Sequence, residues 1–390
     1  MNKFKLFMPV EVHFGTGEFN KVGEYAHDLG KRAFVVTGEI LSKMGLGNRL
    51  VEILKKVNIE TVIYDKVKAN PDCFSIDEAS KILKDEKCDF VIGLGGGSPM
   101  DFAKAVAVAA MHDGPIWSYV NYSGAKFIPP TEKTLPILEI VTTAGTGSEV
   151  TPYAVMVNPE NHIKAAINSP YTYPEISVID PELMISMPPD LTASTGMDAF
   201  AHAFESYINI VRRTLFSDMM ALEAIRLVAG NLATAVKDGS NIEARSNMAW
   251  ASTLAGITIS QANTTAVHAM AQPVSGRTDA PHGSAVAALL PAVMRHTWQA
   301  DIKRFSNIAE AMGIKADGLL IEKKAEMGVE KIEKLLKDIG LGIGLKDIGV
   351  SKDTLEKLTE DTMAYMSRPI SQHPRQFSPE EILEIFNESF

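Results

Sequence analysis

The stretch CDFVIGLGGGSPMDFAK, residues 88–104, decides the fold of this chain of 390 residues. Residues 88–94 are apolar enough for a buried strand, and Gly95–Gly96–Gly97 follow directly. Ser98 and Pro99 are typical of an N-cap and a first helical position. A strand that passes through glycines into a helix offers backbone N–H groups to a phosphate. A tight, well-capped turn would explain the same residues, and neither G-x-G-x-x-G nor the Walker A motif is present.

The same alternation of strand and helix surrounds this stretch. Strands are predicted at residues 31–38, 60–64 and 136–141, and helices at 46–57 and 75–85, the latter capped by Ser75 with Glu78 in capping-box spacing. Continuous apolar strands between helices predict a parallel sheet covered by helices. Ligands bind beyond the carboxyl ends of such strands, which is where Gly38 and the three glycines lie.

A second loop of small residues, TTAGTGSE at residues 142–149, follows the strand 136–141. Two such loops at strand ends favour a long ligand with several phosphate and sugar oxygens over a pair of coincidental turns.

The second half of the chain reads differently. Beyond Met187 the β pattern almost disappears, and helices are predicted at residues 195–210, 215–238, 242–260, 284–297, 302–312 and 325–339. We therefore expect an α/β dinucleotide-binding domain at residues 1–187 and an all-helical, metal-binding domain at residues 188–390.

Candidate metal ligands lie in this second half. Asp198 and His202 stand at i and i+4, on one face of a helix. In VHAMAQPVSGRTDAPHG, residues 267–283, His268 ends an apolar run and His282 is expected in a loop after Pro281. One carboxylate and three imidazoles suit Fe, Zn, Co or Ni better than Mg or Ca. Taken singly, each residue is more often a solvated pair or a hydrogen-bonded core histidine.

Composition excludes several classes of protein. The formal charge of −10 and the lack of a Lys/Arg cluster argue against a nucleic-acid partner. Two cysteines, with no CxxC, indicate a reducing compartment and no thiolate metal site. The N-terminus has no room for a signal peptide before Pro9, and no apolar run approaches the roughly 18 residues of a membrane span. We expect a soluble, cytoplasmic protein without a membrane partner.

Four motifs in order resemble the iron-containing (group III) alcohol dehydrogenases: GGGSPMDFAK from Gly95, TTAGTGSEVT from Thr142, STGMDAFAHAFESY from Ser194 and VHAMAQPVSGRTDAPHG from Val267. The resemblance extends over essentially the whole chain. It implies the architecture of that family and of dehydroquinate synthase, with the metal in a cleft between the domains, and hydride transfer between NAD(P) and an alcohol or aldehyde. It also implies a homodimer or larger homo-oligomer.

The resemblance assigns roles to individual residues. The metal ligands would be Asp198, His202, His268 and His282, with Fe(II) favoured and Zn possible. Cofactor contacts would come from Gly97, Ser98, Asp101, Thr142, Thr143, Thr146 and Lys164, beside the glycine loop that includes Gly96. The family often carries a further His four residues after the third ligand, but this chain has Gln272 there. An amide can bind substrate but cannot relay a proton near neutral pH.

The end of the first predicted strand bears on cofactor choice. NAD-preferring members of the family typically carry an Asp where this chain has Gly38. A carboxylate would repel a 2′-phosphate, so Gly38 favours NADP, with Lys43 and Ser42 as possible phosphate partners. Glu39 turned inward would instead restore a ribose contact.

Three alternatives remain open. A polyol dehydrogenase of the glycerol or diol type, or a non-redox enzyme like dehydroquinate synthase, would share this architecture. A metal-dependent hydrolase would need a water-activating base, for which Gln272 is a poor candidate. A nucleotide-binding module would not need the metal site.

Overall fold

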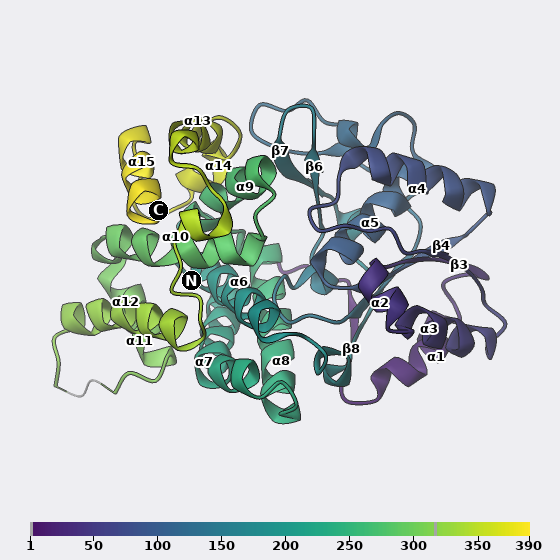
Figure 1. Ribbon diagram of the computed structural model, residues 1–390, viewed down its shortest axis with the longest axis horizontal. Coiled ribbons are helices and arrows are strands. Elements are labelled where there is room, and N and C mark those ends of the chain that lie inside the picture. Colours follow the sequence, from purple (N-terminus) through teal and green to yellow (C-terminus); the bar gives the residue numbers. More distant parts are fainter. Residues whose placement is uncertain (1–2, 316–317) are drawn as a thin grey trace. The chain divides into compact units, whose positions relative to one another are not determined.

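The chain divides into two compact units in the computed structural model, which describes residues 3–315 and 318–390. The α/β unit comprises residues 8–143 and 148–184. The helical unit comprises residues 185–390, the loop 144–147 and the N-terminal segment up to Phe7 (Figure 1). Because the loop 144–147 interrupts the α/β unit, no single cut along the sequence separates the two units. Domains at 1–187 and 188–390 stay a prediction.

A six-stranded parallel sheet forms the centre of the α/β unit, in the order β1-β8-β5-β4-β2-β3. Its strands are β1 (Glu11–Phe14), β2 (Arg32–Val36), β3 (Glu60–Tyr64), β4 (Phe90–Gly95), β5 (Ile137–Val141) and β8 (Ile176–Ile179). A separate antiparallel pair consists of β6 (Tyr153–Asn158) and β7 (Ile163–Asn168). The predicted fold class, a parallel α/β domain followed by a helical one, is confirmed.

Helices cover both faces of the sheet. Successive strand residues point to opposite sides, so each face packs its own side chains against helices. The helices are α1 (Val22–Ala26), α2 (Glu39–Lys43), α3 (Leu46–Lys55), α4 (Cys73–Asp85) and α5 (Gly97–Met111). Phe34 of β2 belongs to the same buried cluster as Phe102 of α5, whereas its neighbour Val35 clusters with Leu50 of α3. The sheet is therefore buried on both sides, which explains the continuous apolar strands in the sequence.

The carboxyl ends of β2, β4 and β5 lie side by side at one edge of the sheet. Val36 pairs with Gly93, and Gly95 pairs with Val141. Gly38 and the two small-residue loops that follow β4 and β5 therefore begin at neighbouring points, as the sequence predicted for a ligand site.

Within the α/β unit, two predicted helix starts are wrong by two or three residues. The helix α4 is capped by Asp72, whose carboxylate accepts from the Ser75 backbone N–H, and not by Ser75. The helix α5 begins at Gly97 with Gly96 as its N-cap, so Ser98 lies inside its first turn. In both segments the backbone enters the helix earlier than the best capping residue in the sequence suggests.

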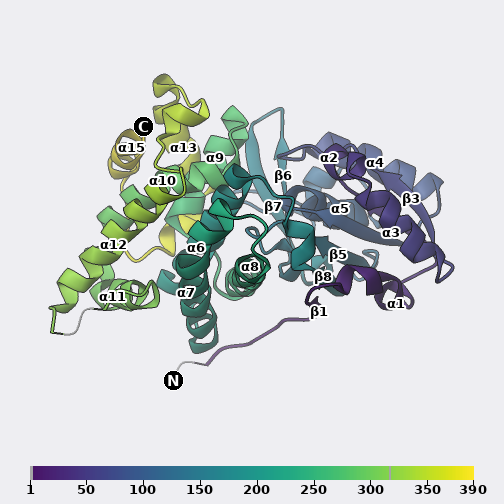
Figure 2. The ribbon, with the colours of Figure 1, turned by 60° about the horizontal axis from the view of Figure 1, so that its bottom comes forward.

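The helical unit contains α6 (Pro189–Ile208), α7 (Leu215–Lys237), α8 (Ile242–Ala262), α9 (Ala266–Thr278), α10 (His282–Thr297), α11 (Ile302–Ala311), α12 (Ile321–Asp338), α13 (Leu355–Tyr365), α14 (Ser367–Ser371) and α15 (Pro379–Glu388). The first three of these helices pack together (Figure 2). Gly196 makes this packing close: a Cβ atom there would lie 2.3 Å from Leu232 Cδ1 and 3.0 Å from Met248 Cε.

The sequence analysis expected no apolar run of the length of a membrane span, but helix α7 is long and apolar enough, by length and composition, to cross a membrane. Within the helical unit it packs against α6 and α8. Its Asp218 forms an ion pair with Arg304 of α11 at 2.6 Å, and its Glu223 pairs with Arg226. Within this unit, α7 is therefore packed as one helix of a bundle.

Candidate metal centre

Helix α6 carries the first two candidate ligands. Asp198 and His202 are both buried, at 3% and 6% exposure, and His202 Nε2 lies 3.9 Å from Asp198 Oδ1. The i, i+4 spacing places both side chains on one face, as the sequence predicted.

Helices α9 and α10 bring the other two histidines to the same point. His268 Nε2 lies 3.3 Å from Asp198 Oδ1, and its ring centroid lies 4.4 Å from that of His202 and 5.3 Å from that of His282. His282 is the first residue of α10 and not a loop residue. Gly283 permits this position, because a Cβ there would lie 2.5 Å from the backbone oxygen of Ser194.

The donor atoms converge as a metal site requires. One donor atom each from Asp198, His268 and His282 lie within 4.8 Å of one another, with His202 beside them. Three nitrogens and one oxygen fit a divalent transition ion.

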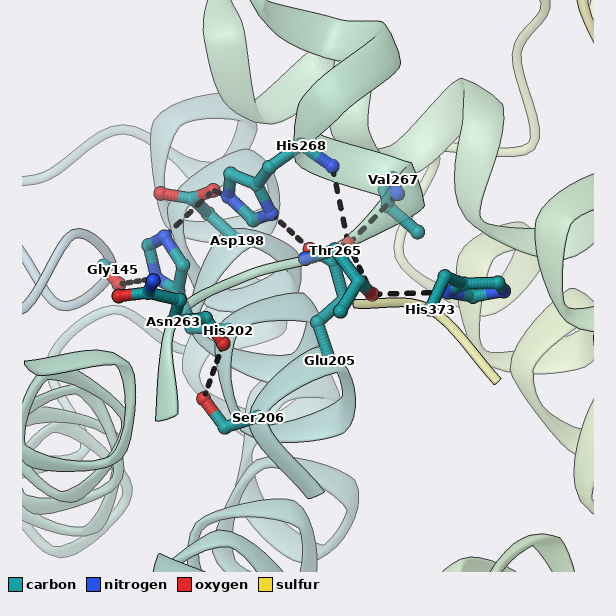
Figure 3. A network of polar contacts seen from close by, with 10 residues as sticks. All are labelled: Gly145, Asp198, His202, Glu205, Ser206, Asn263, Thr265, Val267, His268 and His373. Atoms are coloured by element: carbon teal, nitrogen blue, oxygen red, sulfur yellow. Dashed lines mark hydrogen bonds and ion pairs between the residues drawn. The ribbon is translucent and has the colours of Figure 1, made fainter. Parts of the chain in front are cut away.

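The outer nitrogen of each imidazole also has a contact, and Figure 3 shows those of His202 and His268. His202 Nδ1 lies 3.3 Å from the carbonyl oxygen of Gly145. His282 Nδ1 lies 3.4 Å from Ser275 Oγ. His268 Nδ1 contacts a carboxylate oxygen of Glu205. Metal-binding histidines in proteins are oriented in this way through their second nitrogen.

The charges around these residues favour a cation. Burial tends to raise the pKa of Asp198, but the charge of His202 and the hydrogen bond from His268 hold it below its usual range. Burial tends to lower the pKa of His268, but the Glu205 charge and the hydrogen bond to Asp198 outweigh it and raise the pKa to about 9. Burial lowers the pKa of His202. The metal-free site therefore holds a proton that a bound cation would displace.

The sequence analysis did not single out Glu205 or Ser275. Glu205 stands seven residues after Asp198 on α6, two turns along the same face. A carboxylate in such an apolar helix is the feature of the sequence that could have indicated a role for Glu205. Its partner on α9 could not be predicted from the sequence, because that contact depends on how the helices pack.

Gln272 lies on α9 one turn after His268. The Gln272 amide oxygen is buried and has no hydrogen-bond partner among the residues that the structure describes. A buried acceptor of this kind is costly unless some group donates to it.

The cofactor candidates of the α/β unit surround the glycine loop. A Cβ on Gly96 would lie 2.9 Å from Thr143 Oγ1, so only glycine leaves the backbone open here. Asp101 accepts a hydrogen bond from Ser148 Oγ at 2.6 Å. Thr142 donates its backbone N–H to Gly95 O at 2.9 Å. Helix α5 begins within this loop, with Gly97 and Ser98 in its first turn. The N–H groups of a first helical turn have no acceptor within the helix and attract negative charge.

Lys164 and Thr146 are two further cofactor candidates. Lys164 on β7 is buried and donates to Asn70 Oδ1 at 2.8 Å. Thr146 belongs to the helical unit, in the loop that also provides the Gly145 carbonyl.

Gly38 precedes α2 in an extended conformation. Glu39 does not turn inward: it forms an exposed ion pair with Lys43, Oε1 to Nζ 2.6 Å. Ser42 Oγ donates to Asp65 Oδ2 at 2.8 Å. The two proposed phosphate partners are thus both held by carboxylates in this structure.

The chain is similar to known proteins over nearly its whole length. Residues 9–181 match the family described as iron-containing alcohol dehydrogenase, and residues 192–390 match its C-terminal family. The 1,3-propanediol dehydrogenase of Citrobacter freundii is 39% identical over 99% of both chains. The crystal structure of an archaeal halo-thermophilic alcohol dehydrogenase from a Red Sea brine pool, bound to NZQ, has a TM-score of 0.95 at 35% identity and covers 100% of this chain and 99% of that one. The sulfoacetaldehyde reductase of Bifidobacterium kashiwanohense, in complex with NAD+, has a TM-score of 0.87 at 29% identity, with 100% and 99% covered. The chain therefore belongs to the iron-containing alcohol dehydrogenase family, whose members are oxidoreductases.

Proposed function

We propose that one divalent transition-metal ion is held by Asp198, His202, His268 and His282, and that this site catalyses the reversible oxidation of an alcohol to an aldehyde with a nicotinamide dinucleotide. The observation that carries the proposal is the direction of the imidazoles. The outer nitrogens contact Gly145, Glu205 and Ser275, while Asp198 Oδ1 faces the inner nitrogens of His202 and His268.

When bound, the ion supplies a Lewis acid that lowers the pKa of an alcohol hydroxyl and polarises a carbonyl. Asp198, His202, His268 and His282 would hold the ion by one carboxylate and three neutral imidazoles. Fe(II) is the ion we propose, with Zn an alternative that the same donors accept. Asp198 and His268 are buried, which limits water at the site and strengthens its electrostatic contacts.

The cofactor is proposed to bind at the carboxyl edge of the sheet. Its contacts would come from Gly38, Gly96, Gly97, Ser98, Asp101, Thr142, Thr143, Thr146 and Lys164. The open backbone at Gly96 and the start of α5 suit a pyrophosphate. Lys104 helps to position Asp101 through Ser148. Its buried ammonium donates to Ser148 Oγ at 2.7 Å, and this hydroxyl in turn donates to Asp101.

We propose a preference for NADP over NAD. Gly38 leaves room beside β2 where an aspartate would repel a 2′-phosphate. Lys43 is mostly exposed and its pair with Glu39 is a surface ion pair, which contributes little and which a phosphate can displace. The test is catalytic efficiency with both reduced cofactors, for the wild type and for Gly38→Asp. A wild type that clearly favours NADH, or a Gly38→Asp variant with an unchanged ratio, would contradict the proposal.

Gln272 is proposed to face the substrate. A diol or polyol dehydrogenase is the second candidate function, and one observation favours it: the unpartnered buried oxygen of Gln272 can accept a hydrogen bond from a second substrate hydroxyl. The propanediol activity named for the relative from Citrobacter freundii fits this substrate class. In a panel of mono-alcohols and diols, Gln272→Leu should lose efficiency with diols and not with mono-alcohols. Equal losses on both would remove the case for a diol.

The deciding experiment for the function is an activity assay on protein reconstituted with Fe(II) under anaerobic conditions. Alcohol-dependent reduction of NAD or NADP, followed by absorbance, supports the assignment. Hydrolysis of an ester or phosphate without redox activity would favour a hydrolase instead.

The assembly and the compartment are also proposals. We propose a homodimer or larger homo-oligomer, which light scattering on the purified protein would test. A cytoplasmic location is proposed because Cys73 and Cys88 are both free thiols and buried.

A further inference from the structure

Glu205 is a fully buried carboxylate that contacts the candidate ligand His268 and residues just before it in the chain (Figure 3). Its Oε1 accepts backbone N–H groups from Thr265 at 2.9 Å, Val267 at 2.8 Å and His268 at 3.3 Å, and the hydroxyl of Thr265 at 3.1 Å. These donors stand at the first turn of α9, so the carboxylate caps that helix from the side. Its second oxygen, Oε2, is directed at His268 Nδ1.

This arrangement determines which ring nitrogen of His268 carries the proton. A carboxylate only accepts hydrogen bonds, so Nδ1 must carry the proton and Nε2 is the nitrogen that can bind a metal. The backbone donors hold Oε1 in place, and the side chain cannot rotate without losing them. The same residue thus fixes the start of α9 and the proton position of the histidine on it.

The supports of the three histidines are unequal. His202 leans on a neutral carbonyl at 3.3 Å and His282 on a hydroxyl at 3.4 Å. The support of His268 Nδ1 is a carboxylate, and charge-assisted hydrogen bonds are roughly twice as strong as neutral ones.

We propose that Glu205 is the positioning residue of the metal centre: it selects the Nδ1–H tautomer of His268 and adds negative charge behind the ligand. The proposal rests on the metal site proposed above. It assigns a role in metal affinity to a side chain that does not itself bind the ion.

The test is the Glu205→Gln variant, with Co(II) as the probe. The three backbone donors near Oε1 will hold the amide oxygen, which turns the amide NH2 toward His268 Nδ1. That NH2 group donates, so the histidine proton is forced to Nε2, the metal-binding nitrogen. We expect Co(II) affinity, measured by competition with a chelator, to fall by about 10- to 100-fold. At saturating Co(II), the visible absorption bands should also change in position or intensity.

Asn209→Asp provides the matched control. Asn209 is the C-cap of α6, four residues after Glu205, and is equally buried. Its Nδ2 donates to Ala262 O at 2.7 Å and to Gln372 Oε1 at 3.0 Å. An aspartate places a carboxylate oxygen against those two oxygens, so it should lower the melting temperature. It should leave Co(II) affinity within about threefold of the wild type, because it contacts no ligand.

Glu205→Asp keeps the proposal testable if the amide variant does not fold. It retains the charge but withdraws it from His268 by one methylene, so its Co(II) affinity should be at least about threefold below that of the wild type. Wild-type affinity and spectra in both Glu205 variants would overturn the proposal. A wild type that binds Co(II) no better than His282→Ala would overturn the metal site itself, which distinguishes the two failures.

Discussion

The replacement His373→Asn should change how stability depends on pH. His373 is fully buried in the helical unit, with Nδ1 3.1 Å from Thr265 Oγ1 and Nε2 2.8 Å from Thr297 Oγ1. Burial lowers its pKa to about 3 from an ordinary value of 6.5. The folded protein thus keeps this imidazole neutral at a pH where the unfolded chain protonates it.

The sign and size follow from proton linkage. Between pH 6.5 and about 3 the unfolded state binds one more proton at this residue, so stability falls as pH falls, by about 1.4 kcal/mol per pH unit. Stability is unaffected by this group above pH 7, and at pH 5 the loss is about 2 kcal/mol. Asparagine does not titrate, so His373→Asn should lack this part of the acid loss. Its amide can replace Nδ1 toward Thr265 but does not reach Thr297.

The assay is urea unfolding at pH 5, 6, 7 and 8 on metal-free protein. A Trp117→Phe background restricts the fluorescence signal to Trp250 and Trp298, which lie in the helical unit. The free energy of unfolding of His373→Asn should fall less between pH 8 and pH 5 than that of the wild type, by about 2 kcal/mol. Parallel pH profiles for the two proteins would refute the argument that His373 is neutral when folded.

Three further substitutions test the two sites. Gly96→Val should raise the KM for the cofactor by at least about tenfold, since its Cβ would lie 2.9 Å from Thr143 Oγ1. The amount of bound metal should not change, and an unaltered KM would contradict a pyrophosphate site at Gly96. Lys104→Met should cost about 3–5 kcal/mol of stability, because it leaves several buried oxygens without their donor; a melting temperature like that of the wild type would contradict this. Gly283→Ala should weaken Co(II) binding by about tenfold, since its Cβ meets the Ser194 carbonyl at 2.5 Å and displaces His282; unchanged affinity would place His282 outside the site.

Local patterns predicted the features that depend on neighbours in sequence. The strand at Glu60–Tyr64 was predicted to the residue, because its composition and its flanking helices leave one interpretation. Asp198 and His202 were predicted together, because four residues on a helix bring two side chains to one face. The passage from β4 into α5 was predicted because three glycines directly follow an apolar strand and allow a sharp turn.

Features that depend on packing were not predicted. The strand β1 is short and mostly exposed, and becomes a strand only by pairing with β8, far along the sequence. The position of His282 at a helix start depends on how closely α10 approaches Ser194. Glu205 looked like one more helical carboxylate, and its role emerges only when the first turn of α9 lies against it.

The proposed metal centre is tested most directly by the iron content of the purified protein after anaerobic reconstitution with Fe(II) and removal of excess metal. His268→Ala is the test variant. The control is His27→Ala, which removes an exposed histidine whose Nδ1 lies 2.8 Å from Oδ1 of its neighbour Asp28. We predict about one Fe per chain for the wild type and the control, and less than about a tenth of that for His268→Ala. Equal iron in all three proteins would contradict the assignment of the site.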